Sequence, residues 1–217
     1  MRDEKLLVLY KPLIKAIMGV FGIYALSLVV HPKLVSPGTP LFKPDWLYLG
    51  WFIAGALYTH FFEYFYHRFA LHKGLPALKF LKKSHTQHHW FFNDPNFQRR
   101  DLEALQNITT KWYVFPLLFI GHYLFALKFV SHEYIPTLFL GIIIHFSVFE
   151  ISHWFTHVKG NLFDKIMLQV PVFGRCRAWQ IRHHRIHHDW PLYNFNFTIP
   201  ALGDEAFRTL SPNELET

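Results

Sequence analysis

The sequence predicts an all-α, polytopic membrane protein with about four transmembrane helices and a cytosolic, histidine-rich helical cap. The chain has 217 residues, of which 51% are hydrophobic, 19% aromatic and only 17% charged. Four apolar runs approach the length of about 20 helical residues that a bilayer core of about 30 Å requires. Histidines cluster beside these runs. We therefore expect transmembrane helices at about residues 13–30, 46–66, 112–127 and 134–153, and a cap formed by 67–111 and 154–217.

The elements follow in order along the chain. The first twelve residues mix acids with bases and lead into an apolar run without a small-residue cleavage site, which indicates an anchor rather than a removed signal peptide. Residues 31–45 are rich in Pro and Gly and are expected to form a loop. The third run is short, so it could be tilted or partly re-entrant. In the fourth, Pro136 stands where a helix accepts proline, in its first turn.

The basic residues indicate which ends of the helices face the cytosol. The N-terminal segment counted up to Lys15, residues 67–111 and the tail after 157 hold 19 of the 22 Lys and Arg residues, and only Lys33, Lys43 and Lys128 fall on the other side. Cytoplasmic loops of membrane proteins carry such an excess. This asymmetry accounts for the net charge of +7 without nucleic acid, for which no binding motif is present. The short length and lack of a retention signal favour a bacterial inner membrane over the endoplasmic reticulum.

Cysteine content limits the chemistry. Cys176 is the single cysteine, so an intrachain disulfide framework, a four-thiolate zinc site and an iron–sulfur cluster are excluded. Any bound metal must therefore be held by nitrogen and oxygen.

Ten of the 16 histidines occur in four groups with short, repeated spacings. They are His67 and His72; His85, His88 and His89; His153 and His157; and His184, His187 and His188. One His-x-x-His-His should arise by chance roughly 0.09 times in such a chain, so two indicate a shared role. Ten imidazoles exceed the coordination of one metal, and two metals with about five nitrogens each would use them all.

The spacing predicts how the imidazoles converge. Positions i, i+3 and i+4 share a helix face, so each His-x-x-His-His is expected to aim three imidazoles at one point, and His153 and His157 two more. His67 and His72 are about 140° out of phase on an α-helix and converge only if it ends or bends between them. Gly74 indicates an end nearby. We interpret the remaining histidines as ordinary polar residues, with His183 beside the site but not a ligand; the others are His31, His60, His122, His132 and His145.

This order of histidine motifs resembles the fatty acid hydroxylase superfamily, which includes sterol desaturases, fatty acid 2-hydroxylases and carotenoid hydroxylases. The resemblance covers roughly residues 46–210. Glu63, four residues before His67, resembles the acid that opens the first motif, and NFNFTIPALGDEAFRT resembles the closing segment, with Gly203 where the family usually has Trp. It implies a single domain over 1–217 that holds two iron ions, with zinc as the metal that could replace them in an isolated sample. It also implies the use of O2 to hydroxylate or desaturate a long acyl chain, with a sterol or carotenoid as the alternative substrate.

Four carboxylates are candidates for orienting the imidazoles through their second nitrogens. Glu63 and Glu150 stand at i−4 to His67 and i−3 to His153, while Asp94 and Asp189 follow the two His-x-x-His-His motifs. Ordinary surface charges are the alternative interpretation of each.

The chain has no dinucleotide fingerprint and no haem attachment motif, so electrons are expected from a separate protein such as a cytochrome b5-like protein or a ferredoxin. Four arginines beside the last histidine motif could dock an acidic donor or a lipid head group, or could simply reflect the cytoplasmic excess of positive charge. They are Arg175, Arg177, Arg182 and Arg185. Lys79, Lys82 and Lys83 alternate with apolar residues and are typical of a segment at the membrane surface.

Three other classes fit less well. A transporter would carry ligands near the bilayer midplane, and a transmembrane haem protein would leave the ten clustered histidines unexplained. A zinc-dependent membrane lipid hydrolase could use the same nitrogens. Catalytic zinc usually takes only three protein ligands, which argues against it.

Overall fold

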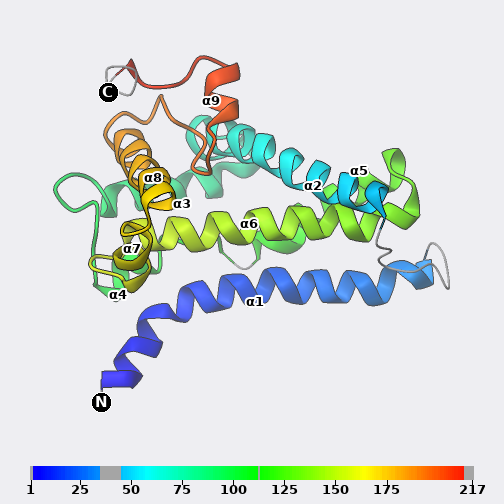
Figure 1. The fold of residues 1–217 in the computed structure, drawn as a ribbon, viewed down its shortest axis with the longest axis horizontal. Coiled ribbons are helices and arrows are strands. Elements are labelled where there is room, and N and C mark those ends of the chain that lie inside the picture. Colours follow the sequence, from blue (N-terminus) through cyan, green and yellow to red (C-terminus); the bar gives the residue numbers. More distant parts are fainter. Residues whose placement is uncertain (1, 35–44, 112, 213–217) are drawn as a thin grey trace. The chain divides into compact units, whose positions relative to one another are not determined.

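The computed structural model describes residues 2–34, 45–111 and 113–212, and, of these, the side chains of 10–31, 45–111 and 113–212. In these ranges all regular structure is helical apart from one isolated β-bridge, between Arg99 and Val158. The all-α prediction is therefore confirmed. The main helices (Figure 1) are α1 (Arg2–Leu34), α2 (Trp46–Phe65), η1 (Tyr66–Lys73), α3 (Lys79–Phe91), α4 (Leu102–Leu105), α5 (Val114–Phe129), α6 (Ile135–His157), α7 (Leu162–Met167), α8 (Pro171–Asp189) and α9 (Leu202–Ala206).

The chain divides into two compact units. One contains Tyr10–Thr59 and Thr110–Glu150, and the other contains Met1–Leu9, His60–Thr109 and Ile151–Thr217. We refer to them as the apolar unit and the histidine unit.

In the apolar unit, helices pack through buried apolar side chains and through glycine. Ala16 and Val20 of α1 contact Phe115 of α5 and Ile143 of α6. The packing of α2 on α6 is closer still, since a Cβ atom at Gly141 would lie 2.1 Å from the carbonyl oxygen of Phe52. Small residues are typical where membrane helices approach this closely.

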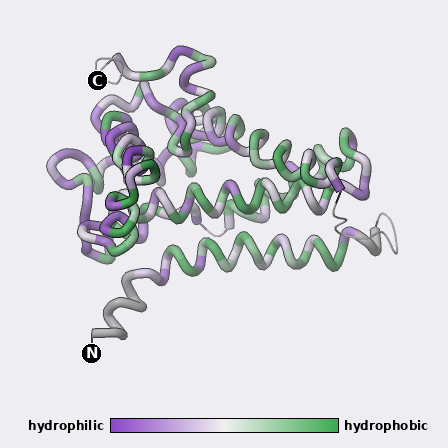
Figure 2. Tube along the Cα trace, in the orientation of Figure 1, coloured by the Kyte–Doolittle hydropathy of each residue, from purple (hydrophilic) through white to green (hydrophobic). Residues whose placement is uncertain are grey.

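Within the described ranges, two helical stretches are long and apolar enough to cross a bilayer, judged by length and composition. They are Tyr10–His31 and His132–His157, which match the first and fourth predicted spans. Figure 2 shows the hydrophobic residues that run along the described part of α1. Val114–Phe129 is apolar but shorter, and Trp112, the expected start of that span, lies outside the described residues. The second predicted span is helical as α2, whose last turns contain the buried polar residues His60 and Glu63. Four spans therefore remain a prediction.

In the histidine unit, short helices are fixed by polar contacts that the sequence supplies locally. Asn161 caps α7 by accepting a hydrogen bond from the backbone N–H of Asp164. Asp164 in turn forms a buried ion pair with Arg177 of α8, at 2.8 Å. Pro171 begins α8 at a position where a helix needs no N–H donor. These contacts fix α7 against α8, which carries the last histidine motif.

The closing segment packs tightly against the end of α2. A Cβ atom at Gly203 would lie 2.6 Å from Cγ of Tyr64, and the ring of Tyr64 stacks on Phe207 with centroids 5.0 Å apart. The space beside residue 203 is therefore already filled by an aromatic ring. This packing gives a physical reason for a glycine at position 203.

Candidate metal centre

The structure gathers all ten predicted histidines into two groups, and every member belongs to the histidine unit. Within each group the ligand nitrogens lie within 4.8 Å of one another. Cluster A contains His67, His72, His85, His89 and His187. Cluster B contains His88, His153, His157, His184 and His188.

The first motif converges through a change in helix type. After Phe65, the chain continues as the π-helix η1, which closes i→i+5 hydrogen bonds and so brings positions five apart onto one face. The Nε2 atoms of His67 and His72 lie 3.2 Å apart. We expected the helix to end or bend between them, but it widens instead, and Gly74 ends it with φ at 75°. Short π-helical stretches are frequent at functional sites.

Each His-x-x-His-His motif divides between the two clusters, contrary to the prediction that it aims three imidazoles at one point. His85 and His89 of α3 turn to cluster A, while His88 turns to cluster B. On α8 the assignment is reversed: His184 and His188, at positions i and i+4, belong to cluster B, and only His187 belongs to cluster A. The reason is angular: positions i and i+4 differ by about 40° on a helix, whereas adjacent positions differ by about 100°.

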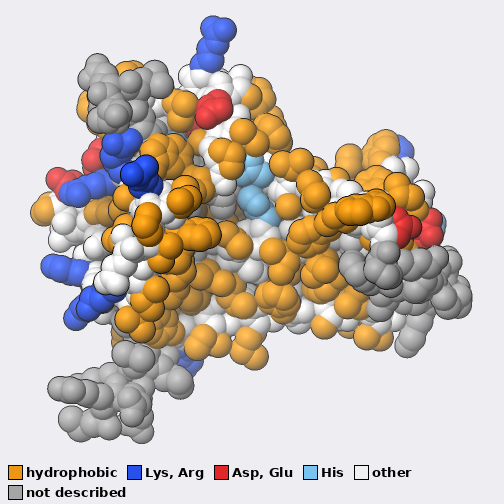
Figure 3. All heavy atoms as spheres, in the orientation of Figure 1, with side chains coloured by type: hydrophobic (Ala, Val, Ile, Leu, Met, Phe, Trp, Pro, Cys, Tyr) orange, Lys and Arg blue, Asp and Glu red, His pale blue; other side chains and the backbone are white. Residues whose placement is uncertain are grey.

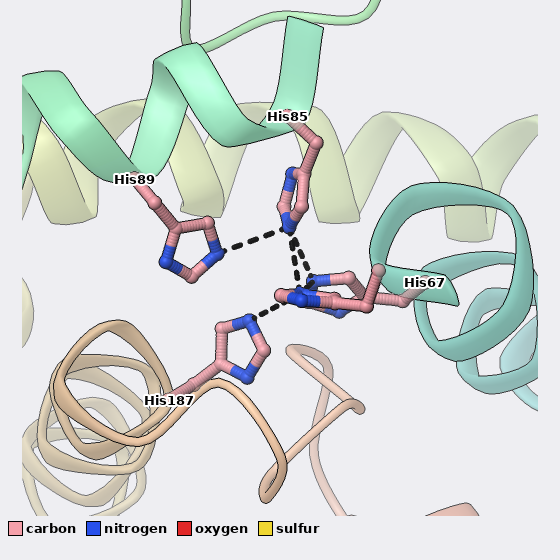
Figure 4. A group of neighbouring side chains, drawn as sticks. His67, His85, His89 and His187 are labelled. Atoms are coloured by element: carbon pink, nitrogen blue, oxygen red, sulfur yellow. Dashed lines mark hydrogen bonds between the residues drawn. The ribbon is translucent and has the colours of Figure 1, made fainter. Parts of the chain in front are cut away.

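The spacing of the nitrogens fits neighbouring ligands of a metal ion. In cluster A, which Figure 4 shows with imidazoles from η1, α3 and α8 turned toward one another, neighbouring Nε2 atoms are 2.9 to 3.2 Å apart. In cluster B they are 3.0 to 3.2 Å apart. Nitrogens at about 2.05 Å from an ion would be about 2.9 Å apart at right angles and about 3.4 Å apart in a tetrahedron. The contacting pairs are therefore close enough to be neighbouring ligands of one ion, and each cluster offers five nitrogen donors.

Backbone carbonyls fix the tautomer of three imidazoles. The Nδ1–H groups of His67 and His187 donate to the carbonyl oxygens of Phe195 and Tyr193, at 2.6 and 2.7 Å, and that of His157 donates to Phe97 at 2.9 Å. Because a carbonyl only accepts, Nδ1 must carry the proton and Nε2 must keep its lone pair. Each Nε2 is thus left free to bind a metal ion, an arrangement typical of ligand histidines.

Burial keeps the imidazoles in their neutral form. It lowers the pKa of His72 to about 2 and that of His89 to about 3, with nearby histidines adding to the effect. Burial likewise holds the pKa of His88 and His187 well below the ordinary value. Every side chain of cluster B is buried, whereas three of cluster A are partly exposed. At neutral pH these nitrogens are therefore in the form that binds metal.

The carboxylates expected to orient imidazoles have other partners. Glu63 accepts hydrogen bonds from the backbone N–H groups of Phe197 and Thr198, at 2.5 and 3.0 Å. The expected bond from Glu63 to the second nitrogen of His67 was wrong, since that nitrogen donates to Phe195. The prediction considered only Glu63, one helical turn before His67, whereas the actual acceptor is a backbone carbonyl of a segment distant in the sequence.

The other three acids have various surroundings. Glu150 accepts a hydrogen bond from the backbone N–H of Thr110 at 3.1 Å. Asp94 forms an ion pair with Arg185 on the surface, and Asp189 is exposed at the end of α8.

Sequence reasoning missed the carboxylate of Asp204, which is fully buried. It accepts hydrogen bonds from the backbone N–H groups of Phe195 and Asn196, at 2.8 and 2.6 Å, and from the Thr209 hydroxyl at 2.7 Å. Its second oxygen also lies 3.6 Å from Nε2 of His183. Asp204 therefore fixes the segment whose carbonyl holds His67. Its position in ALGDEAF, directly after three small or apolar residues and before the acidic Glu205, was the available signal.

Of the four arginines considered for docking, two are already paired. Arg177 is only 3% exposed and is bound to Asp164 and Gln180, so its expected surface role was wrong. Arg185 pairs with Asp94. Arg175 and Arg182 are exposed.

Helices of membrane-spanning length and two clusters of five imidazole nitrogens are the features of a histidine-rich membrane protein able to bind metal. A family model described as fatty acid hydroxylase matches residues 52–209. The chain therefore belongs to the fatty acid hydroxylase family, whose members are membrane hydroxylase and desaturase oxidoreductases and are typically metal-dependent. Comparison with curated proteins and with solved structures gave no match.

Proposed function

We propose that the protein is an O2-dependent di-iron lipid oxidase that hydroxylates or desaturates an unactivated C–H bond of a long acyl chain. The observation that carries this proposal is the pair of five-imidazole clusters that share α3 and α8. The ten cluster histidines would hold two iron ions, which supply the redox chemistry for activating O2 when bound. Imidazole also suits zinc, copper and nickel, so the choice of iron rests on the family.

The protein's own groups would keep the site ready for metal and shield it from water. The carbonyls of Phe195, Tyr193 and Phe97 hold Nδ1 protons and so direct three Nε2 lone pairs into the clusters. The aromatic rings of Phe92 and Phe97 lie against His157, with centroids 4.4 and 4.8 Å away. Such an apolar wall excludes water from cluster B and favours oxidation of a bound lipid over side reactions.

The topology that suits this function has four membrane spans, with α2 and α5 joining the two longer ones, and a cytosolic cap that contains both clusters. The concentration of 19 of 22 basic residues in the expected cytosolic segments supports this arrangement. Electrons would come from a separate cytochrome b5-like protein or ferredoxin on the cytosolic side. A bacterial inner membrane is the proposed location.

A zinc-dependent lipid hydrolase is the alternative of a different class. Five nitrogens in each cluster argue against it, because catalytic zinc usually has three protein ligands. Within the oxidase proposal, a sterol or carotenoid is the alternative to an acyl chain.

The test compares lipids from cells that express the wild type, His88→Ala or His132→Ala at equal membrane levels, with iron, oxygen and an electron donor supplied. His132 is exposed and belongs to neither cluster, so its substitution controls for loss of a histidine. A lipid that gains one oxygen in the wild type and the control establishes a hydroxylase, and one that loses two hydrogens establishes a desaturase. Ester cleavage without dependence on oxygen would instead support the hydrolase.

A further inference from the structure

Residues 162–173, which form α7 and the start of α8, expose an unusual number of large apolar side chains. Val172 is 70% exposed, Leu162 68% and Phe173 60%. Three more exposed apolar residues lie between them: Ile166, Leu168 and Val170. Figure 3 shows hydrophobic side chains gathered around α7 and the start of α8, with Lys and Arg side chains beside them. A surface of this kind normally marks contact with a membrane or another molecule.

The exposed charges between Val158 and Ala178 have one sign. Lys159, Lys165 and Arg175 are exposed. The one acid between Val158 and Ala178 is Asp164, which is buried and paired with Arg177. A positive rim around apolar side chains complements anionic lipid head groups above acyl chains.

The position of the segment in the chain favours a bilayer over a protein partner. Residue 162 follows by five positions His157, the last residue of α6, and α6 is one of the helices long enough to span a membrane. A transient electron donor needs a small, polar contact rather than six protruding apolar side chains. We propose that residues 162–173 insert into the bilayer interface on the side at which α6 ends, with their apolar side chains among the acyl chains and their basic residues at anionic head groups. This inference rests on the membrane location in the proposed function.

The experiment measures the depth of spin labels in the full-length, metal-loaded protein, reconstituted in vesicles of phosphatidylcholine and phosphatidylglycerol. Cys176 is exposed and is the single cysteine, so the wild type can be labelled there directly, and Cys176→Ser gives a background for other sites. Labels at Val172→Cys and Lys165→Cys sample the apolar surface and its rim. Glu205→Cys is the aqueous control, and Ile144→Cys in α6 is the membrane control.

We expect the label at position 172 to collide with O2 more than with a water-soluble nickel chelate, at a depth of about 5–10 Å, and the label at 165 to lie at the head groups. Nickel accessibility at 172 equal to that at 205 would overturn the inference. Shielding of 172 from both reagents would overturn it too, in favour of a protein partner or a second copy. If position 144 is also aqueous, the membrane location itself fails; if 144 is deep and 172 is not, the proposed function stands without this insertion.

Discussion

The substitution Asp204→Asn tests whether the buried acid outside the histidine motifs maintains the metal centre. Its carboxylate accepts hydrogen bonds from two backbone N–H groups, of Phe195 and Asn196, and from the hydroxyl of Thr209. Asparagine has the same shape but replaces one acceptor oxygen with an NH2 donor, so at least one of these donors must face another donor. The hydrogen bonds that position the backbone at Phe195 are then weakened, and with them the position of the Phe195 carbonyl, which accepts the Nδ1 proton of His67.

The expected cost follows from these contacts. A buried N–H left without an acceptor costs about 1–3 kcal/mol, and the remaining bonds weaken because their acceptor loses its charge. The sum is about 3 kcal/mol, which in a chain of this size lowers the melting temperature by about 6–12 °C. Because Asp204 is fully buried, solvent cannot replace the lost acceptor.

The assay combines thermal unfolding of the purified protein with metal analysis by mass spectrometry. Glu205→Gln is the matched control, since Glu205 is the adjacent acid and is exposed. We expect Asp204→Asn to melt earlier and to lose metal from cluster A, which contains His67, while the control behaves as the wild type. An unchanged melting temperature together with a full metal content would refute the positioning role of Asp204.

Three further predictions follow from burial and close packing. Because cluster B is buried throughout and cluster A is partly exposed, a chelator should remove metal in two phases, with the first from cluster A; a single phase in stopped-flow measurements would contradict this. In the apoprotein, cluster histidines such as His72 and His89 are neutral when folded but have a pKa of about 6.5 when unfolded, so the unfolded chain binds more protons as the pH falls. The free energy of unfolding, measured by denaturant titration, should therefore fall between pH 6.5 and 5.5 by about 1 kcal/mol for each cluster histidine whose folded pKa lies well below this range. Gly141→Ala should destabilise the fold by about 1–3 kcal/mol in thermal melts, because its Cβ would meet the carbonyl of Phe52, whereas Gly121→Ala, which meets nothing within 4 Å in the described part of the chain, should not.

The sequence was sufficient to select the ten clustered histidines because their information is local. Repeated short spacings place side chains on defined helix faces, whatever the rest of the chain does. The same reasoning was wrong in directing His85, His88 and His89 to a single point. Positions i+3 and i+4 are adjacent, and adjacent side chains on a helix differ in direction by about 100°. Two metal positions on neighbouring faces of the helix accommodate that angle, which a single convergence point does not.

The partners of the imidazoles were not predictable in this way. His67 is held by a carbonyl 128 residues away, and His157 by one 60 residues away, and every residue has a carbonyl. The residue type therefore does not show which carbonyls will accept a hydrogen bond from an imidazole. The π-helix at Tyr66–Lys73 was hidden for a related reason: its sequence is ordinary for a helix, and only tertiary contacts of both His67 and His72 favour the wider turn.

The exchange of roles between α3 and α8 has a mechanical consequence for the proposed site. Each helix supplies two imidazoles to one cluster and one to the other, so a movement of α3 against α8 displaces ligands of both clusters. The rings of His89 in cluster A and His188 in cluster B also stack, with centroids 4.2 Å apart. Loss of metal from cluster A should therefore loosen cluster B, although the two share no ligand, and the second phase of removal by a chelator should follow the first rather than run independently of it. This coupling suits a reaction that requires both metals together.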